Sequence, residues 1–153
     1  MKHFKLFFAC LLMAILSIGQ VWAETVEFTP SNCTSWTSSK TAQSQTLSGI
    51  TLSSTSAANN TQLRLYASNT HTITSTVGNI TKVEFTCTGS GTGSYGPGKM
   101  SLASGSAGSY SYDGTKGTWT GNAATLSLSG GQTRCTSIVV TYTPSGGSTK
   151  PTV

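Results

Sequence analysis

The sequence is poor in charge, and acidic and imidazole groups are especially few. Only 8% of the 153 residues are charged, and the chain holds one Asp, three Glu and two His. General acid/base catalysis and metal binding depend on these side chains. The chain therefore lacks the groups that most enzyme classes need. We therefore expect a protein that is not an enzyme and has no catalytic residues, metal ligands or cofactor.

Long hydrophobic runs are also missing. The longest, residues 6–18, is about 13 residues and too short to span a hydrocarbon core of roughly 30 Å. It follows Lys2 and Lys5 and precedes residues 21–23 (VWA), an order typical of a secretory signal peptide. We expect residues 1–23 to be cleaved near Ala23. The mature chain would then begin at Glu24 and be secreted, extracellular or periplasmic, without a membrane span.

The positive charges form no basic run. Removing residues 1–23 lowers Lys+Arg from 9 to 7, which leaves a net charge of +3 against the four acidic residues. Neutralising several phosphates at once needs clustered cations, so we expect no nucleic-acid partner. The seven remaining cations are scattered singly, at Lys40, Arg64, Lys82, Lys99, Lys116, Arg134 and Lys150.

Three cysteines remain beyond the leader: Cys33, Cys87 and Cys135. An oxidising compartment allows one disulfide among three. If the strand that ends at Cys87 lies antiparallel to the strand that starts at Cys135, these two residues meet, and we prefer this pair. Three buried thiols are the alternative. Cys10 also permits acylation as in bacterial lipoproteins, but the apolar run continues past it, which disfavours that interpretation.

What the chain has instead is hydroxyl groups, with 24 Ser and 27 Thr, and apolar residues at alternate positions. A period of two predicts half-buried strands, and no segment has a period of 3.6. We predict an all-β antiparallel β-sandwich of jelly-roll type with about eight or nine short strands over residues 24–143, followed by a linker-like tail, residues 144–153. The alternating sets are Val26/Phe28, Ile50/Leu52, Leu63/Leu65, Val83/Phe85/Cys87, Ala124/Leu126/Leu128 and Ile138/Val140/Tyr142.

Three local motifs indicate structure rather than catalysis. Residues 91–96 match G-x-G-x-x-G, but no helical pattern follows to hold a pyrophosphate, so we interpret the segment as a loop. His71 is the one histidine beyond the leader, and we expect it in a turn rather than in a catalytic triad. Asp113-Gly114 lies between two strand-like segments and predicts a hairpin.

Aromatic side chains are the remaining candidates for function. Trp36, Tyr95, Tyr110 and Tyr112 lie among Ser, Thr and Asn, and flat rings beside hydroxyl and amide groups suit the stacking of sugar rings. Tyr110 and Tyr112 share one face of a predicted strand. Trp119 is expected in the core, and the same alternative, filling a core short of aliphatic residues, applies to the tyrosines.

Four stretches resemble a β-sandwich module of secreted and cell-surface proteins of Bacteroidota-type bacteria. They are residues 63–74 (LRLYASNTHTIT), 78–87 (GNITKVEFTC), 117–121 (GTWTG) and 135–142 (CTSIVVTY). Such modules are similar to carbohydrate-binding sandwiches, and the resemblance implies an accessory, non-catalytic role. The shared residues are mainly core and turn positions, so the resemblance implies no catalytic group.

The sequence thus supports two hypotheses. The first is a secreted, non-catalytic binding module that recognises a glycan or cell-surface ligand through exposed aromatic residues. The alternative is a structural or adhesive extracellular protein whose sheet edges make contacts with other proteins. The sequence leaves the oligomeric state open.

Overall fold

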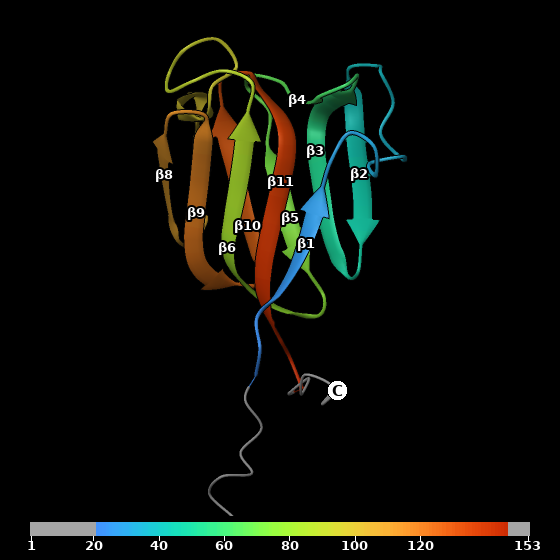
Figure 1. Ribbon diagram of the computed structural model, residues 1–153, viewed down its shortest axis with the longest axis vertical. Helices are drawn as coiled ribbons and strands as arrows, with labels where there is room; N and C mark the ends of the chain where they lie inside the picture. The colour runs from blue at the N-terminus through green and yellow to red at the C-terminus, as the bar shows by residue number, and fades with distance from the viewer. Residues whose placement is uncertain (1–20, 147–153) are drawn as a thin grey trace, which may run out of the picture.

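The computed structural model describes residues 21–146. Eleven strands form one hydrogen-bonded sheet in which every strand pair is antiparallel. Nine of them follow one path, with β1 paired to β11 and β2 paired to β3 beside it, and the sheet folds into two layers (Figure 1). Among the described residues there is no α-helix, and the one helical element is the 3-10 turn η1 (Pro97–Lys99). The predicted all-β antiparallel class is confirmed, with more strands than the expected eight or nine.

The front layer in Figure 1 has the strand order β1-β11-β6-β9-β8, and the second layer has the order β2-β3-β5-β10-β7. The short strand β4 (Leu63–Leu65) pairs with both β3 and β11 and so joins the two layers. The front strands are β1 (Glu24–Phe28), β11 (Thr133–Pro144), β6 (Gly78–Cys87), β9 (Lys116–Ala123) and β8 (Ser109–Asp113); the others are β2 (Thr41–Leu47), β3 (Ile50–Asn59), β5 (His71–Ser75), β10 (Thr125–Gly130) and β7 (Met100–Leu102).

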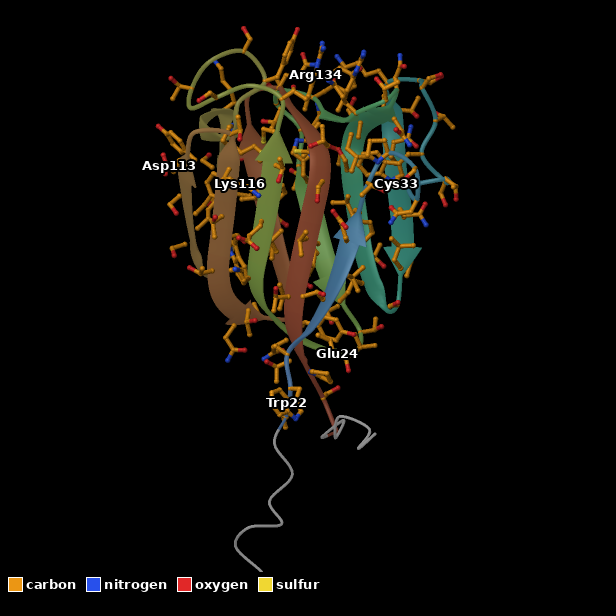
Figure 2. The ribbon with its side chains drawn as sticks, viewed as in Figure 1. Trp22, Glu24, Cys33, Asp113, Lys116 and Arg134 are labelled. Carbon is orange, nitrogen blue, oxygen red and sulfur yellow. The ribbon has the colours of Figure 1, made fainter. Side chains whose placement is uncertain are left out.

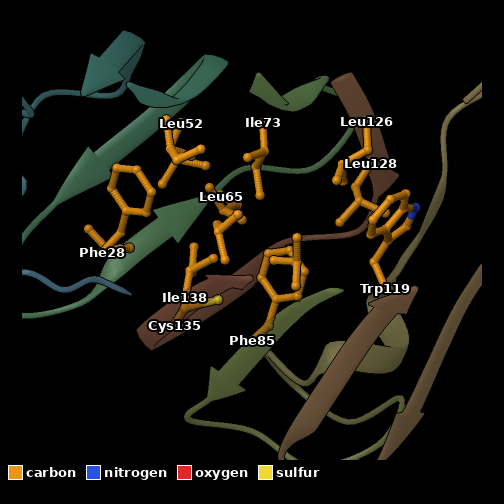
Figure 3. Close-up of a cluster of buried hydrophobic side chains, with 14 of the residues drawn as sticks. Phe28, Leu52, Leu65, Ile73, Phe85, Trp119, Leu126, Leu128, Cys135 and Ile138 are labelled. Carbon is orange, nitrogen blue, oxygen red and sulfur yellow. The ribbon is translucent and has the colours of Figure 1, made fainter. Parts of the chain in front are cut away.

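Alternation along the strands builds the core between the layers. Val83, Phe85 and Cys87 of β6 are buried, and the residues between them are half-buried. Side chains of a strand point alternately to its two faces, so each strand contributes every second residue to one interior. Trp119 is fully buried in this cluster and its Nε1 donates to the Ala107 carbonyl at 2.9 Å, which confirms its expected core position (Figure 3).

The two layers leave two seams where edge strands face each other. On one side, the segment between β1 and β2, residues 29–40, covers the seam. Cys33 and Trp36 of this segment are buried in the core. The Gln45 Oε1 accepts a hydrogen bond from the Ser35 backbone N–H at 2.9 Å, so the segment is tied to β2. On the other side, β7 and β8 end the strand path, and residues 103–108 connect these two strands.

The predicted hairpin is confirmed. Asp113 ends β8 and pairs with Lys116, which begins β9, so the two-residue turn is Gly114-Thr115. Gly114 has φ +53°, in the left-handed region that glycine enters without steric cost.

Most of the predicted leader, including Cys10, lies outside the described residues, as do residues 147–153 of the predicted tail. The first strand begins at Glu24, and β11 extends to Pro144.

Candidate functional site

A shallow groove lies between the facing edge strands β7 and β8. Its volume is about 380 Å³, at the lower end of the range of ligand pockets. Apolar and aromatic side chains form most of the lining, and serine hydroxyls stand beside them. The lining residues are Met100, Ser101 and Leu102 from β7 and Tyr110, Ser111 and Tyr112 from β8.

Tyr110 is the aromatic residue of this groove whose position is fixed by its contacts. Its ring is half-buried and meets Phe85 edge to face, with the ring centroids 6.2 Å apart and the planes at 71°. Its hydroxyl donates to the Pro97 carbonyl at 2.8 Å. Burial raises the pKa of Tyr110 far above its usual range, and the nearby Cys87 and Cys135 add to the shift. The hydroxyl therefore stays neutral and remains a donor.

Tyr112 is the exposed aromatic residue of the groove. It is the one large apolar side chain exposed among residues 24–146, at 47%. Tyr110 and Tyr112 are two residues apart on β8 and both line the groove, which confirms that they share a face. Gly98 lets the Tyr112 ring approach the backbone of η1, because a Cβ there would come within 2.8 Å of the ring. The two tyrosines thus present one buried and one accessible aromatic surface.

The structure does not bring the other two predicted aromatics to this groove. The expectation that Trp36 is exposed is wrong. Its side chain is 5% exposed and points from the segment between β1 and β2 into the core. Tyr95 is half-buried and stacks on the Arg134 guanidinium, 3.5 Å from ring centroid to Cζ. Of the four candidates, Tyr110 and Tyr112 remain as one site.

Cys87 and Cys135 lie directly opposite each other on β6 and β11. Both are buried free thiols, with the Sγ atoms 3.8 Å apart. The hydrogen bond with Cys87 and burial raise the pKa of Cys135 well above its ordinary value. The two strands are antiparallel and bring Cys87 opposite Cys135, as the sequence predicts. The disulfide itself stays a prediction. Cys33 is a third buried thiol, remote in sequence, and burial raises its pKa to about 11.

His71 is not a turn residue, as the sequence had suggested. It opens β5 and is 3% exposed, and its Nδ1 lies 2.8 Å from Oγ of Ser54 on the neighbouring strand β3. Burial lowers the pKa of His71 to about 4. Spacing gave no sign of this pair, because the two residues are 17 positions apart and meet only through strand pairing. The imidazole is therefore neutral at physiological pH and forms part of the interior.

No cluster of three or more His, Cys, Asp or Glu side chains arranged like metal ligands occurs in residues 21–146. Within the same residues, no helix has the length and apolar character needed to cross a membrane.

Comparison with protein-family models, curated protein sequences and solved structures finds no match to this chain. The resemblance to Bacteroidota-type modules therefore rests on the sequence stretches alone.

Proposed function

We propose that the protein is a non-catalytic binding module that holds a glycan in the groove between β7 and β8. The observation that carries the proposal is the exposed Tyr112 ring beside the fixed Tyr110 ring. The C–H face of a sugar ring stacks on a flat aromatic surface, and sugar hydroxyls exchange hydrogen bonds with neighbouring hydroxyl groups. Ser101 and Ser111, which line the same groove, supply such hydroxyls.

The rigidity of the groove supports this function. The Tyr110 ring is held by Phe85 and by the Pro97 carbonyl, so it loses little freedom when a ligand binds. A preorganised surface avoids part of the entropy cost of binding. Residues 1–23 resemble a secretory signal peptide, so we infer that the protein meets its ligand outside the cytoplasm.

Affinity gel electrophoresis on a panel of neutral and acidic polysaccharides tests the proposal. We expect at least one polysaccharide to retard the protein, and Tyr112→Ala to weaken that retardation about tenfold, since burial of an aromatic side chain contributes about 1.5 kcal/mol or more. On a neutral polysaccharide, which offers no acidic group to the cations near Tyr66, Tyr66→Ala is the matched control, because Tyr66 is a half-buried tyrosine outside the groove. Absence of retardation on every polysaccharide, or equal loss in the control, contradicts the proposal.

The edge position of β8 favours a second candidate. β8 pairs with β9 on one side only, and an edge strand can accept a strand from another chain. This would be the structural or adhesive role. It predicts association with a second copy or a surface protein that light scattering detects, with little effect of Tyr112→Ala, because strand addition depends on backbone hydrogen bonds.

A further inference from the structure

The two arginines of the chain, Arg64 and Arg134, lie opposite each other. Arg64 is the central residue of β4, and Arg134 is its direct partner on β11. Their sequence neighbours Leu63, Leu65 and Cys135 are fully buried, so both arginine side chains point to the outer face of the sheet. Cβ atoms of directly opposed residues are about 4.5–5.5 Å apart, and like charges on directly opposed residues destabilise a strand pair.

No carboxylate compensates these charges in residues 21–146. The ion pair found there joins Lys82 and Glu84. Glu24 accepts a hydrogen bond from Tyr142, and in Figure 2 it lies at the end of the molecule opposite to Arg134. Glu27 accepts from Ser137, and Asp113 lies at the β8–β9 turn. The Nε atoms of both arginines are buried without a hydrogen-bond partner, which adds a desolvation cost that the described residues do not offset.

Aromatic rings fix the positions of the cations at this end of the sandwich. Tyr95 stacks on the Arg134 guanidinium, and Lys40 Nζ lies 4.7 Å from the centroid of the Tyr66 ring, two residues beyond Arg64. Tyr95 holds φ +64°, an unusual conformation for a residue other than glycine. Strained backbone of this kind persists where the surroundings enforce it and often marks a functional position. Stacking covers one face of the Arg134 guanidinium and leaves its planar edge to donate hydrogen bonds.

We propose that Arg64 and Arg134 form a binding site for an oxyanion, a sulfate, phosphate or carboxylate group held between the two guanidinium groups. Such a group accepts charge-assisted hydrogen bonds from both side chains, removes the repulsion between them and satisfies buried N–H donors. Tyr95 and Lys40 complete the surroundings of the site.

An isolated acidic group suits this surface better than a nucleic acid. Two opposed arginines are joined here only by Lys40, which lies over the ring of Tyr66, two residues beyond Arg64. The remaining described cations, Lys82, Lys99 and Lys116, form no run in the sequence. Nucleic-acid binding requires contacts with several phosphates. The oxyanion is therefore either a free anion or the acidic group of a polysaccharide, and the site is independent of the Tyr110–Tyr112 groove.

The side-chain NMR signals of the arginines test the proposal on the unaltered chain. Labelling with 15N-arginine gives two Nε–Hε signals, one from each arginine. We expect sodium sulfate to shift both signals in a saturable way, and sodium chloride of equal ionic strength to shift neither. Equal responses to the two salts would overturn the site.

Variants extend the test. We expect Arg64→Gln and Arg134→Gln each to weaken sulfate binding about tenfold or more, whereas Lys116→Gln, with the same loss of charge on β9, leaves it unchanged. Without an oxyanion at low salt, Arg64→Gln should unfold at the same or a higher temperature than wild type, because it removes the repulsion. Equal loss of sulfate binding in Lys116→Gln, or a large fall in the unfolding temperature of a folded Arg64→Gln in the absence of oxyanion, contradicts the proposal.

Polymer probes then identify the source of the anion. Binding of dextran sulfate that exceeds binding of sulfate, with none for dextran, assigns the acidic group to a polysaccharide. Equal affinity per sulfate group assigns a free anion. Binding of a single-stranded DNA oligonucleotide that depends on Lys116 and decreases steeply with salt would replace the oxyanion site by an extended nucleic-acid surface.

Discussion

The hydroxyl of Tyr110 donates a hydrogen bond to the carbonyl oxygen of Pro97 at 2.8 Å. The bond links edge strand β8 to η1, the short turn that precedes β7. Because β7 and β8 form the two sides of the groove, this bond connects the two sides through a single side chain. It explains how a groove between two edge strands keeps a defined shape.

Removing that hydroxyl tests its contribution. Tyr110→Phe leaves the Pro97 carbonyl without its partner, and we expect the free energy of unfolding in urea to decrease by about 1 kcal/mol. Tyr112→Phe is the control, because the Tyr112 hydroxyl has no hydrogen bond within residues 21–146 and its loss should change stability by less than about 0.5 kcal/mol. Equal effects of the two changes would contradict the role given to Tyr110.

The buried His71 makes stability depend on pH. Its pKa is lowered from 6.5 to about 4 by burial, so the folded state favours the neutral ring. The stabilisation is complete above pH 6.5 and is lost as the pH falls from 6.5 to 4, because the unfolded chain binds a proton that the folded chain does not. The expected loss is on the order of 3 kcal/mol. Urea unfolding across this range measures it.

His71→Gln separates this effect from the titration of carboxylates. The variant should be less stable at neutral pH, since the hydrogen bond of Ser54 with the ring is lost, and its stability should change much less between pH 6.5 and 4. An unchanged pH dependence in the variant would show that His71 is not the titrating group.

Two glycines allow the buried Trp119 ring to pack against the backbone. A Cβ at Gly121 would lie 2.5 Å from Cζ2 of Trp119, and one at Gly108 would lie 2.6 Å from the same ring. We expect Gly121→Ala to destabilise the fold by about 1–3 kcal/mol, as overpacking does. Gly131→Ala is the control, because the nearest atom there is a side-chain carbon of Lys99 at 3.2 Å. Thermal unfolding of both variants distinguishes the packing effect from the general cost of an added methyl group.

The opposed thiols predict one specific disulfide. Under oxidising conditions we expect Cys87 and Cys135 to form the bond and Cys33 to remain a thiol, because only the first two lie side by side. The bond closes a loop of 48 residues, so the oxidised protein should be more stable by about 2–4 kcal/mol. Peptide mass mapping without reduction identifies the pairing. Peptides linked through Cys33, or three free thiols after oxidative refolding, would refute it.

The strands with apolar alternation could be predicted from the sequence, and a strand with polar inward residues could not. Val83, Phe85 and Cys87 identify β6 by themselves. The inward positions of β2 are Gln43 and Gln45, which are buried because their amides bind the backbone of the segment between β1 and β2. No periodicity of apolar residues indicates such a strand. The wrong prediction that His71 lies in a turn has the same cause. His71 is a polar residue at a buried strand position, where apolar alternation gives no indication of a strand.

The candidate groove was partly accessible to sequence reasoning. The spacing of Tyr110 and Tyr112 on one strand predicts a shared face, and the structure places both in one groove. The contributions of Met100 and Leu102 depend on β7 and β8 facing each other across the seam, which follows from the path of the whole sheet. The pairing of Arg64 with Arg134 likewise joins residues 70 positions apart through strand register.

Met100 offers the most direct test of the central claim, that the groove between β7 and β8 is the binding site. It lines the groove and is the one methionine beyond the predicted leader, so 13C-methyl methionine labelling of the mature chain gives a single NMR signal. The account predicts that a retained polysaccharide shifts this signal saturably in wild type and not in Tyr112→Ala. A bound polysaccharide that leaves the Met100 signal unchanged would contradict the account.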